Sequence, residues 1–130
     1  IEPRVYKANT SVSWRDYKRK SENKVKDLAF LTKRLGRTKD GFLLLEFEIK
    51  STVDREIKPS SLWIYQGKEE RIIHSLFISD SKASKTKPVF GTVSIAMSDL
   101  VSQVSGSLEL KVSERENLKV ELPREVLWRR

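Results

Sequence analysis

Apolar and polar residues alternate along most of the chain after residue 40. In "FLLLEFEIK", residues 42–50, every second side chain is apolar, and these are Leu43, Leu45, Phe47 and Ile49. The intervening side chains, which we expect on a solvent-facing side, are Leu44, Glu46, Glu48 and Lys50. A period of two residues is typical of a β-strand with one buried face. The segment is therefore predicted to be a half-buried strand.

Further strands are predicted by the same pattern. Residues 61–65, "SLWIY", and 71–79, "RIIHSLFIS", flank the turn-forming "QGKEE" and are expected to form a hairpin. A strand is predicted at 89–97, "VFGTVSIAM", followed by one helical turn with Ser98 or Asp99 as its cap. A closing hairpin is predicted from "SLELKV" and "LKVELP". Its inward residues are expected to be Leu108, Leu110, Val112, Leu118, Val120 and Leu122.

The segment from Ser21 to Gly36, "SENKVKDLAFLTKRLG", allows two interpretations. It fits a helix that is capped by Ser21 and stopped by Gly36. It fits equally a strand that pairs with residues 42–50 through the turn "RTKDG". The sequence alone leaves both open.

Short strands separated by turns, without alternating helices, indicate a mainly β fold. We expect a single antiparallel β-sandwich of six or seven strands over residues 41–123. The basic segment 1–40 would precede it as an arm, a short helix or a first strand, and residues 124–130 would form a C-terminal tail.

Three stretches carry a resemblance to a known class of domain. They are "LLLEFEIKSTVDREIKPSSLWIY", "TKPVFGTVSIAMSDL" and "GSLELKVSERENLKVELP". Over about residues 42–123 the chain resembles the Ig-like β-sandwich domains that serve as accessory or assembly modules in bacterial envelope, secretion and conjugation machines. The cysteine and tryptophan signature of true immunoglobulin domains is missing, because the chain has no cysteine. The resemblance implies a fold and an assembly role.

Positive charge is concentrated near the start of the chain. Residues 1–40 hold 12 of the 26 Lys and Arg residues and 5 of the 18 Asp and Glu residues, a net charge of +7, whereas residues 41–130 carry +1. Such asymmetry favours an acidic partner, whether nucleic acid, anionic lipid or an acidic protein surface.

Aromatic residues are interleaved with this charge in "SWRDYKRKSENKVK", residues 13–26. Phosphates attract Lys and Arg, and aromatic rings stack on single-stranded bases, which makes the segment a candidate nucleic-acid surface. A basic segment with a tryptophan is equally typical of an arm that docks on a protein. A second tryptophan in the tail "EVLWRR" favours the protein-docking role. The candidate partner-binding residues are Trp14, Arg15, Tyr17, Lys18, Arg19, Lys20, Lys24, Lys26, Arg34, Arg37 and Trp128.

Catalytic chemistry has little support in the sequence. The one histidine, His74, lies in a predicted strand beside Ile72, Leu76 and Ile78, without the signature of a nucleophile and base pair. Glu46 and Glu48 are two apart on an exposed strand side, which is typical of a solvated face. Glycines form no phosphate-binding pattern, and a single histidine without cysteines does not make a zinc site. We therefore expect no enzyme, no cofactor and no metal.

Membrane and compartment signals are equally sparse. No apolar run is longer than that from Phe42 to Leu45, which is far shorter than the about 20 residues of a spanning helix. The absence of cysteine fits both a reducing cytosol and the bacterial envelope, and the resemblance favours the envelope. The sequence therefore predicts a non-catalytic module that binds a protein or a second copy of itself, with nucleic-acid binding as the alternative.

Overall fold

The chain is mainly β, as the alternation predicts. The computed structural model describes residues 12–16, 22–25, 27–101, 104, 106–111 and 117–122. Helical structure in this part of the chain is limited to two 3-10 turns, η1 (Pro59–Ser61) and η2 (Met97–Asp99). The turn expected near residue 98 is present, but its cap position is Ala96 and no side chain caps it, so the predicted Ser98 or Asp99 cap is wrong.

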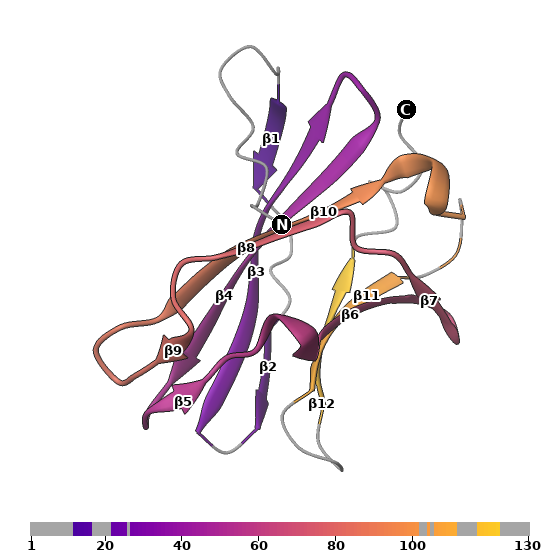
Figure 1. Cartoon of the computed structure of the whole chain (residues 1–130). Helices are drawn as coiled ribbons and strands as arrows, with labels where there is room; N and C mark the ends of the chain where they lie inside the picture. Colours follow the sequence, from indigo (N-terminus) through magenta and orange to yellow (C-terminus); the bar gives the residue numbers. More distant parts are fainter. Residues whose placement is uncertain are drawn as a thin grey trace.

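Six strands form the larger antiparallel sheet, in the order β1-β3-β4-β10-β8 with β2 also paired to β3 (Figure 1). They are β1 (Val12–Asp16), β2 (Glu22–Val25), β3 (Leu28–Thr38), β4 (Phe42–Ser51), β8 (Ser75–Ile78) and β10 (Val89–Ala96). Because β2 pairs with the first part of β3 and β1 with the second part, β1 and β2 follow one another along the same edge of the sheet.

Four strands form the second antiparallel sheet, in the order β12-β11-β6-β7. They are β6 (Leu62–Gln66), β7 (Glu69–Arg71), β11 (Gly106–Lys111) and β12 (Asn117–Leu122). A two-stranded pair, β5 (Arg55–Glu56) and β9 (Lys82–Ala83), lies at one end of the molecule (Figure 1). The side-chain amide of Asn23 on β2 donates to the carbonyl of Lys119 on β12 at 3.2 Å, which joins the two larger sheets along one side.

One hydrophobic cluster takes side chains from both larger sheets. The four alternating residues predicted to be inward on β4 are all buried in it. The closing hairpin contributes Leu108, Leu110, Leu118 and Val120, as predicted. Val112 and the side chain of Leu122 lie outside the part of the chain that the structure describes. The rings of Phe30 and Phe47 meet edge to face with centroids 5.5 Å apart, a favourable aromatic arrangement.

The strand interpretation of residues 21–36 is confirmed from Leu28 onward, where the chain pairs with β4, and the helix interpretation is wrong. Residues 22–25 form β2, and β3 begins at Leu28 and pairs with β4 in a hairpin. Gly41 closes the turn with φ +93°, a backbone conformation that suits glycine. Leu28 and Phe30 are buried and Ala29 is not, so burial follows a period of two, and pairing with β4 satisfies the backbone that a helix would have satisfied internally.

Residues 71–79 form two short strands in different sheets rather than one strand. Only β7 pairs with β6 in the expected hairpin, whereas β8 pairs with β10 in the larger sheet. The chain crosses between the sheets at Ile72 to His74. His74 is therefore exposed at a bend and not in line with Leu76 and Ile78, and its ring stacks on Phe42 with centroids 4.4 Å apart.

The predicted solvent-facing side of β4 is partly covered. Leu44 is 1% exposed and Glu48 is 6% exposed, although both lie on the side opposite to the core cluster. Lys50 is exposed as expected. Neighbouring strands on both sides of β4 place Leu31 and Phe90 directly beside Glu48, which explains why its carboxylate is shielded.

Candidate binding surface on the outer face of the larger sheet

Alternate residues of neighbouring strands build the face of the larger sheet that points away from the core. Strand register places Arg34, Glu46, Thr92 and Phe77 opposite one another in a row across β3, β4, β10 and β8. The next row contains Leu31, Glu48 and Phe90 on β3, β4 and β10. We call these seven residues, with Trp14 and Lys33, the outer-face surface.

A β-bulge in β3 determines which cations reach this surface. The register with β4 shifts between Thr32 and Arg34, so that Lys33 is the extra residue. Thr32 pairs with Phe47 and is buried, on the inner side, whereas Arg34 pairs with Glu46 on the outer side. Without the bulge Arg34 would share the inner side with Thr32, because side chains alternate along a strand.

Both cations of the bulge form ion pairs with the carboxylates of β4. The guanidinium of Arg34 donates to both oxygens of Glu46, from Nε at 2.5 Å and from Nη2 at 2.7 Å. The Nζ of Lys33 lies 3.4 Å from Oε1 of Glu48. Bidentate pairing of this kind fixes the plane of a guanidinium. The carboxylates thus compensate the charge of Lys33 and of Arg34, and Arg34 is one of the predicted partner-binding residues.

Trp14 extends the surface onto β1. Trp14 pairs with Gly36, which has no side chain, and the Trp14 ring lies with its centroid 4.3 Å from the guanidinium carbon of Arg34. This is the geometry of a cation–π interaction. Trp14, Arg34 and Glu46 therefore form one stacked and ion-paired unit across three strands.

The other predicted binding residues are distributed differently. Lys24 is exposed on β2 and lies 3.7 Å from a carboxylate oxygen of Glu22. Arg37 is half-buried and pairs with Leu43, on the opposite side of the sheet from Arg34. Arg15 lies on β1, and its side chain is outside the description. Tyr17, Lys18, Arg19, Lys20, Lys26 and Trp128 lie outside the described residues. Within the described part, the structure brings together Trp14 and Arg34 from the predicted set.

Two exposed phenylalanines complete the surface and were not predicted. Phe77 on β8 is 50% exposed and Phe90 on β10 is 47% exposed. Phe77 pairs with Thr92, two residues from Phe90, so the two rings are diagonal neighbours on one face. The signal was present in "SLFIS" and "PVFGTV", where an aromatic ring occupies a position that the alternation assigns to the solvent side.

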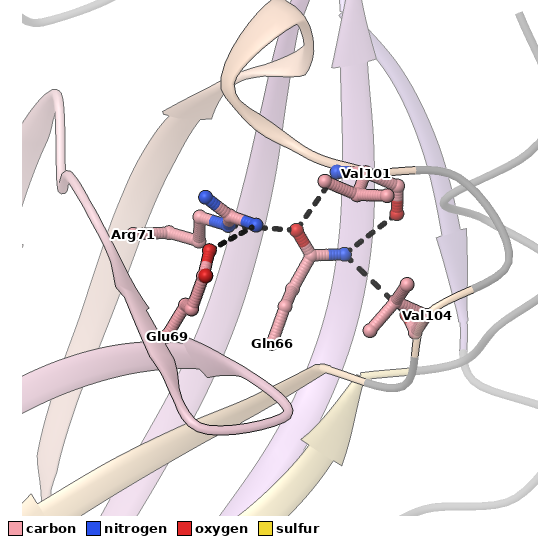
Figure 2. A network of polar contacts seen from close by, with 5 residues as sticks. All are labelled: Gln66, Glu69, Arg71, Val101 and Val104. Carbon is pink, nitrogen blue, oxygen red and sulfur yellow. Dashed lines mark hydrogen bonds and ion pairs between the residues drawn. The ribbon is translucent and has the colours of Figure 1, made fainter.

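A buried glutamine on the smaller sheet holds the connection from β10 to β11, as Figure 2 shows. Gln66 is 2% exposed, and its amide nitrogen donates to the carbonyls of Val101 at 2.7 Å and Val104 at 3.4 Å. Its amide oxygen accepts from the backbone N–H of Val101 at 2.8 Å and from Nε of Arg71 at 3.0 Å. Glu69 lies 3.3 Å from Arg71. All hydrogen-bonding atoms of the amide are engaged, which gives Gln66 a structural role.

Sites for metals and small molecules are not evident in the described residues. No group of three or more His, Asp or Glu side chains there could hold a metal ion. A recess of about 40 Å³ lies beside η1 and is lined by Leu28, Arg55, Ile57, Ser61 and Leu110 among others. Small-molecule pockets are typically about 300 Å³ or larger, so this recess fits water rather than a cofactor.

One carboxylate outside the surface has a perturbed pKa. The Nζ of Lys87 lies 3.1 Å from Asp80, and its hydrogen bond and positive charge lower the pKa of Asp80 below the usual value. Backbone N–H groups of Ser81 and Lys82 contribute in the same direction. This pair closes the loop that carries β9 and has no part in the outer-face surface.

Comparison with known proteins was made at three levels. Protein-family models, curated proteins and solved structures give no match to the chain. The part of the chain that the structure describes contains no helix long and apolar enough to cross a membrane.

Proposed function

We propose that this chain is a non-catalytic protein-binding module with an Ig-like β-sandwich fold, an assembly component of a bacterial envelope or secretion-type complex. The fold and the setting rest on the sequence resemblance. The binding role rests on one observation. The outer-face surface combines two exposed phenylalanines with cations that are already paired to carboxylates.

Paired cations argue for a protein partner over nucleic acid. Binding to nucleic acid gains its free energy chiefly from cations that neutralise phosphates. Here a phosphate would have to displace Glu46 from Arg34 and Glu48 from Lys33, and the two carboxylates would repel it. Exposed aromatic rings next to compensated charge are instead typical of protein interfaces.

Nucleic-acid binding by the N-terminal basic residues is the second candidate. It is favoured by the net charge of +7 on residues 1–40. Fluorescence anisotropy of labelled single- and double-stranded oligonucleotides, at low and at moderate salt, separates the two functions. We expect no affinity tighter than the roughly 10⁻⁴ M end of non-specific binding. Micromolar affinity that falls steeply with salt and with Trp14→Ala would contradict the proposed function.

A further inference from the structure

Strand β8 is the last strand of the larger sheet, and one of its edges is unpaired in the described residues. The backbone N–H of Ser79 donates to the carbonyl of Phe90 at 2.7 Å. The backbone N–H and C=O groups of the odd-numbered residues Phe77 and Ser79 therefore point toward β10. Backbone groups alternate in direction along an antiparallel strand. The N–H and C=O groups of Leu76 and Ile78 therefore point away from β10, toward the free edge.

Charge is missing from this edge and present at the others. The other strands at the edges of sheets in the described part have the sequences VSWRD, ENKV, EER, NLKVEL, RE and KA, and each contains at least one charged residue. Strand β8 reads SLFI, without charge and without proline. Charged side chains at sheet edges prevent the addition of further strands. Strand β8 lacks this protection, and its exposed Phe77 adds apolar surface.

We infer that β8 is a self-association edge, where a second copy of the chain adds its own β8 in antiparallel orientation. This inference rests on the proposed protein-binding function and names the partner. A two-fold axis perpendicular to the sheet at Phe77 pairs Leu76 of each copy with Ile78 of the other. Both residues present free backbone groups, so the pairing is self-complementary, as a two-fold interface requires. Phe77 then lies opposite its symmetry mate on the outer face, with Phe90 beside it.

The absence of charge at the edge of β8 is the reason for choosing a second copy of the chain as the partner. The chain carries a net charge of +8, most of it on residues 1–40, and two copies repel each other wherever this charge is brought together. At β8 the outer-face neighbours Ser75, Phe77, Thr92 and Ser94 are all uncharged, so a symmetric approach brings no like charges together. The edge formed by β1 and β2 has charged residues in both of its strands instead.

The test is sedimentation velocity of the full chain over a range of concentrations, with three variants. Phe77→Lys places two like charges opposite each other at the axis, and Ile78→Pro removes an N–H that points to the partner and not to β10. Val53→Lys is the matched control, because Val53 is 50% exposed, as Phe77 is, and lies in the connection from β4 to β5. Circular dichroism confirms that each variant is folded.

We expect a dimer in the wild type, a loss of association of at least about tenfold in Phe77→Lys and in Ile78→Pro, and no change in Val53→Lys. If Ile78→Pro does not fold, Phe77→Lys alone decides. A wild-type monomer at all concentrations, or a dimer that survives Phe77→Lys, overturns the inference. Either result leaves the protein-binding function in place with a different partner or edge. Salt-dependent oligonucleotide binding removes that function whatever the oligomeric state.

Discussion

The guanidinium of Arg34 lies 4.3 Å from the centre of the Trp14 ring while it donates to both carboxylate oxygens of Glu46. The bulge at Lys33 makes this arrangement possible, because it turns Arg34 to the outer side of β3. Trp14 and Arg34, which the sequence indicated for partner binding, thus already contact each other within the chain. Their mutual contact is the reason why we regard this part of the surface as preorganised and charge-compensated.

The Trp14 and Arg34 contact should be measurable as a coupling free energy. We expect a double-mutant cycle of Trp14→Ala and Arg34→Ala to give about 0.5–1 kcal/mol in the free energy of unfolding, the usual value for a cation–π pair near the surface. Urea unfolding monitored by circular dichroism provides the four values. Additive effects of the two substitutions would show that the ring and the guanidinium do not interact in solution.

Gly91 has no room for a side chain. A Cβ atom there would collide with Cζ of the buried Phe47 ring. We expect Gly91→Ala to lower the free energy of unfolding by about 1–3 kcal/mol, the usual cost of overpacking. Combining it with Phe47→Leu should cost less than the sum of the two single changes, because the shorter side chain vacates that space. If the two changes were additive, the Phe47 ring would not fill the space beside Gly91.

Gln66 should not tolerate replacement by glutamate. A carboxylate cannot donate to the carbonyls of Val101 and Val104, so Gln66→Glu leaves acceptors facing each other in a buried site. We expect a loss of about 1–3 kcal/mol in the free energy of unfolding. Asn117→Asp makes the same chemical change at an exposed position and should have little effect. Equal effects of both would mean that the Gln66 amide is solvated.

The pH dependence of Asp80 has a defined sign. Lys87 lowers the pKa of Asp80 in the folded chain, so the ionised carboxylate favours the folded state above the unfolded pKa, and this contribution is lost as the pH falls through the lower, folded pKa. We expect an NMR titration to find the pKa of Asp80 below 3.8, and Lys87→Met to raise it. A pKa unaffected by Lys87→Met would contradict the ion pair.

Local alternation predicted the parts of the fold that depend on a single strand. The burial of Leu43, Phe47, Leu108 and Val120 follows directly from the period of two, because a sheet with one covered face imposes that period. The helix and strand interpretations of residues 21–36 could not be separated in this way. Their outcome depends on pairing with β4, a contact between segments that the pattern does not contain.

The outer-face surface could not be predicted from one strand, because it depends on how several strands pair. The bulge at Lys33 is a property of the register between β3 and β4, and it decides that Arg34 meets Glu46 while Arg37 faces the other way. The crossing at Ile72 to His74 separates β7 from β8 and makes β8 an edge. Neither feature leaves a local signal in the sequence. Alternation does assign Phe77 and Phe90 to the solvent side of their strands, but their meeting on one face depends on the pairing of β8 with β10.

The most direct measurement is residue-resolved amide hydrogen exchange of β8 at low and at high protein concentration. The N–H groups of Leu76 and Ile78 point to the free edge, and the N–H of Phe77 points to β10, which makes Phe77 an internal control. We predict that Leu76 and Ile78 exchange rapidly in dilute protein and become protected as the concentration rises, while Phe77 is protected throughout. Rapid exchange of Leu76 and Ile78 at every concentration would contradict the account.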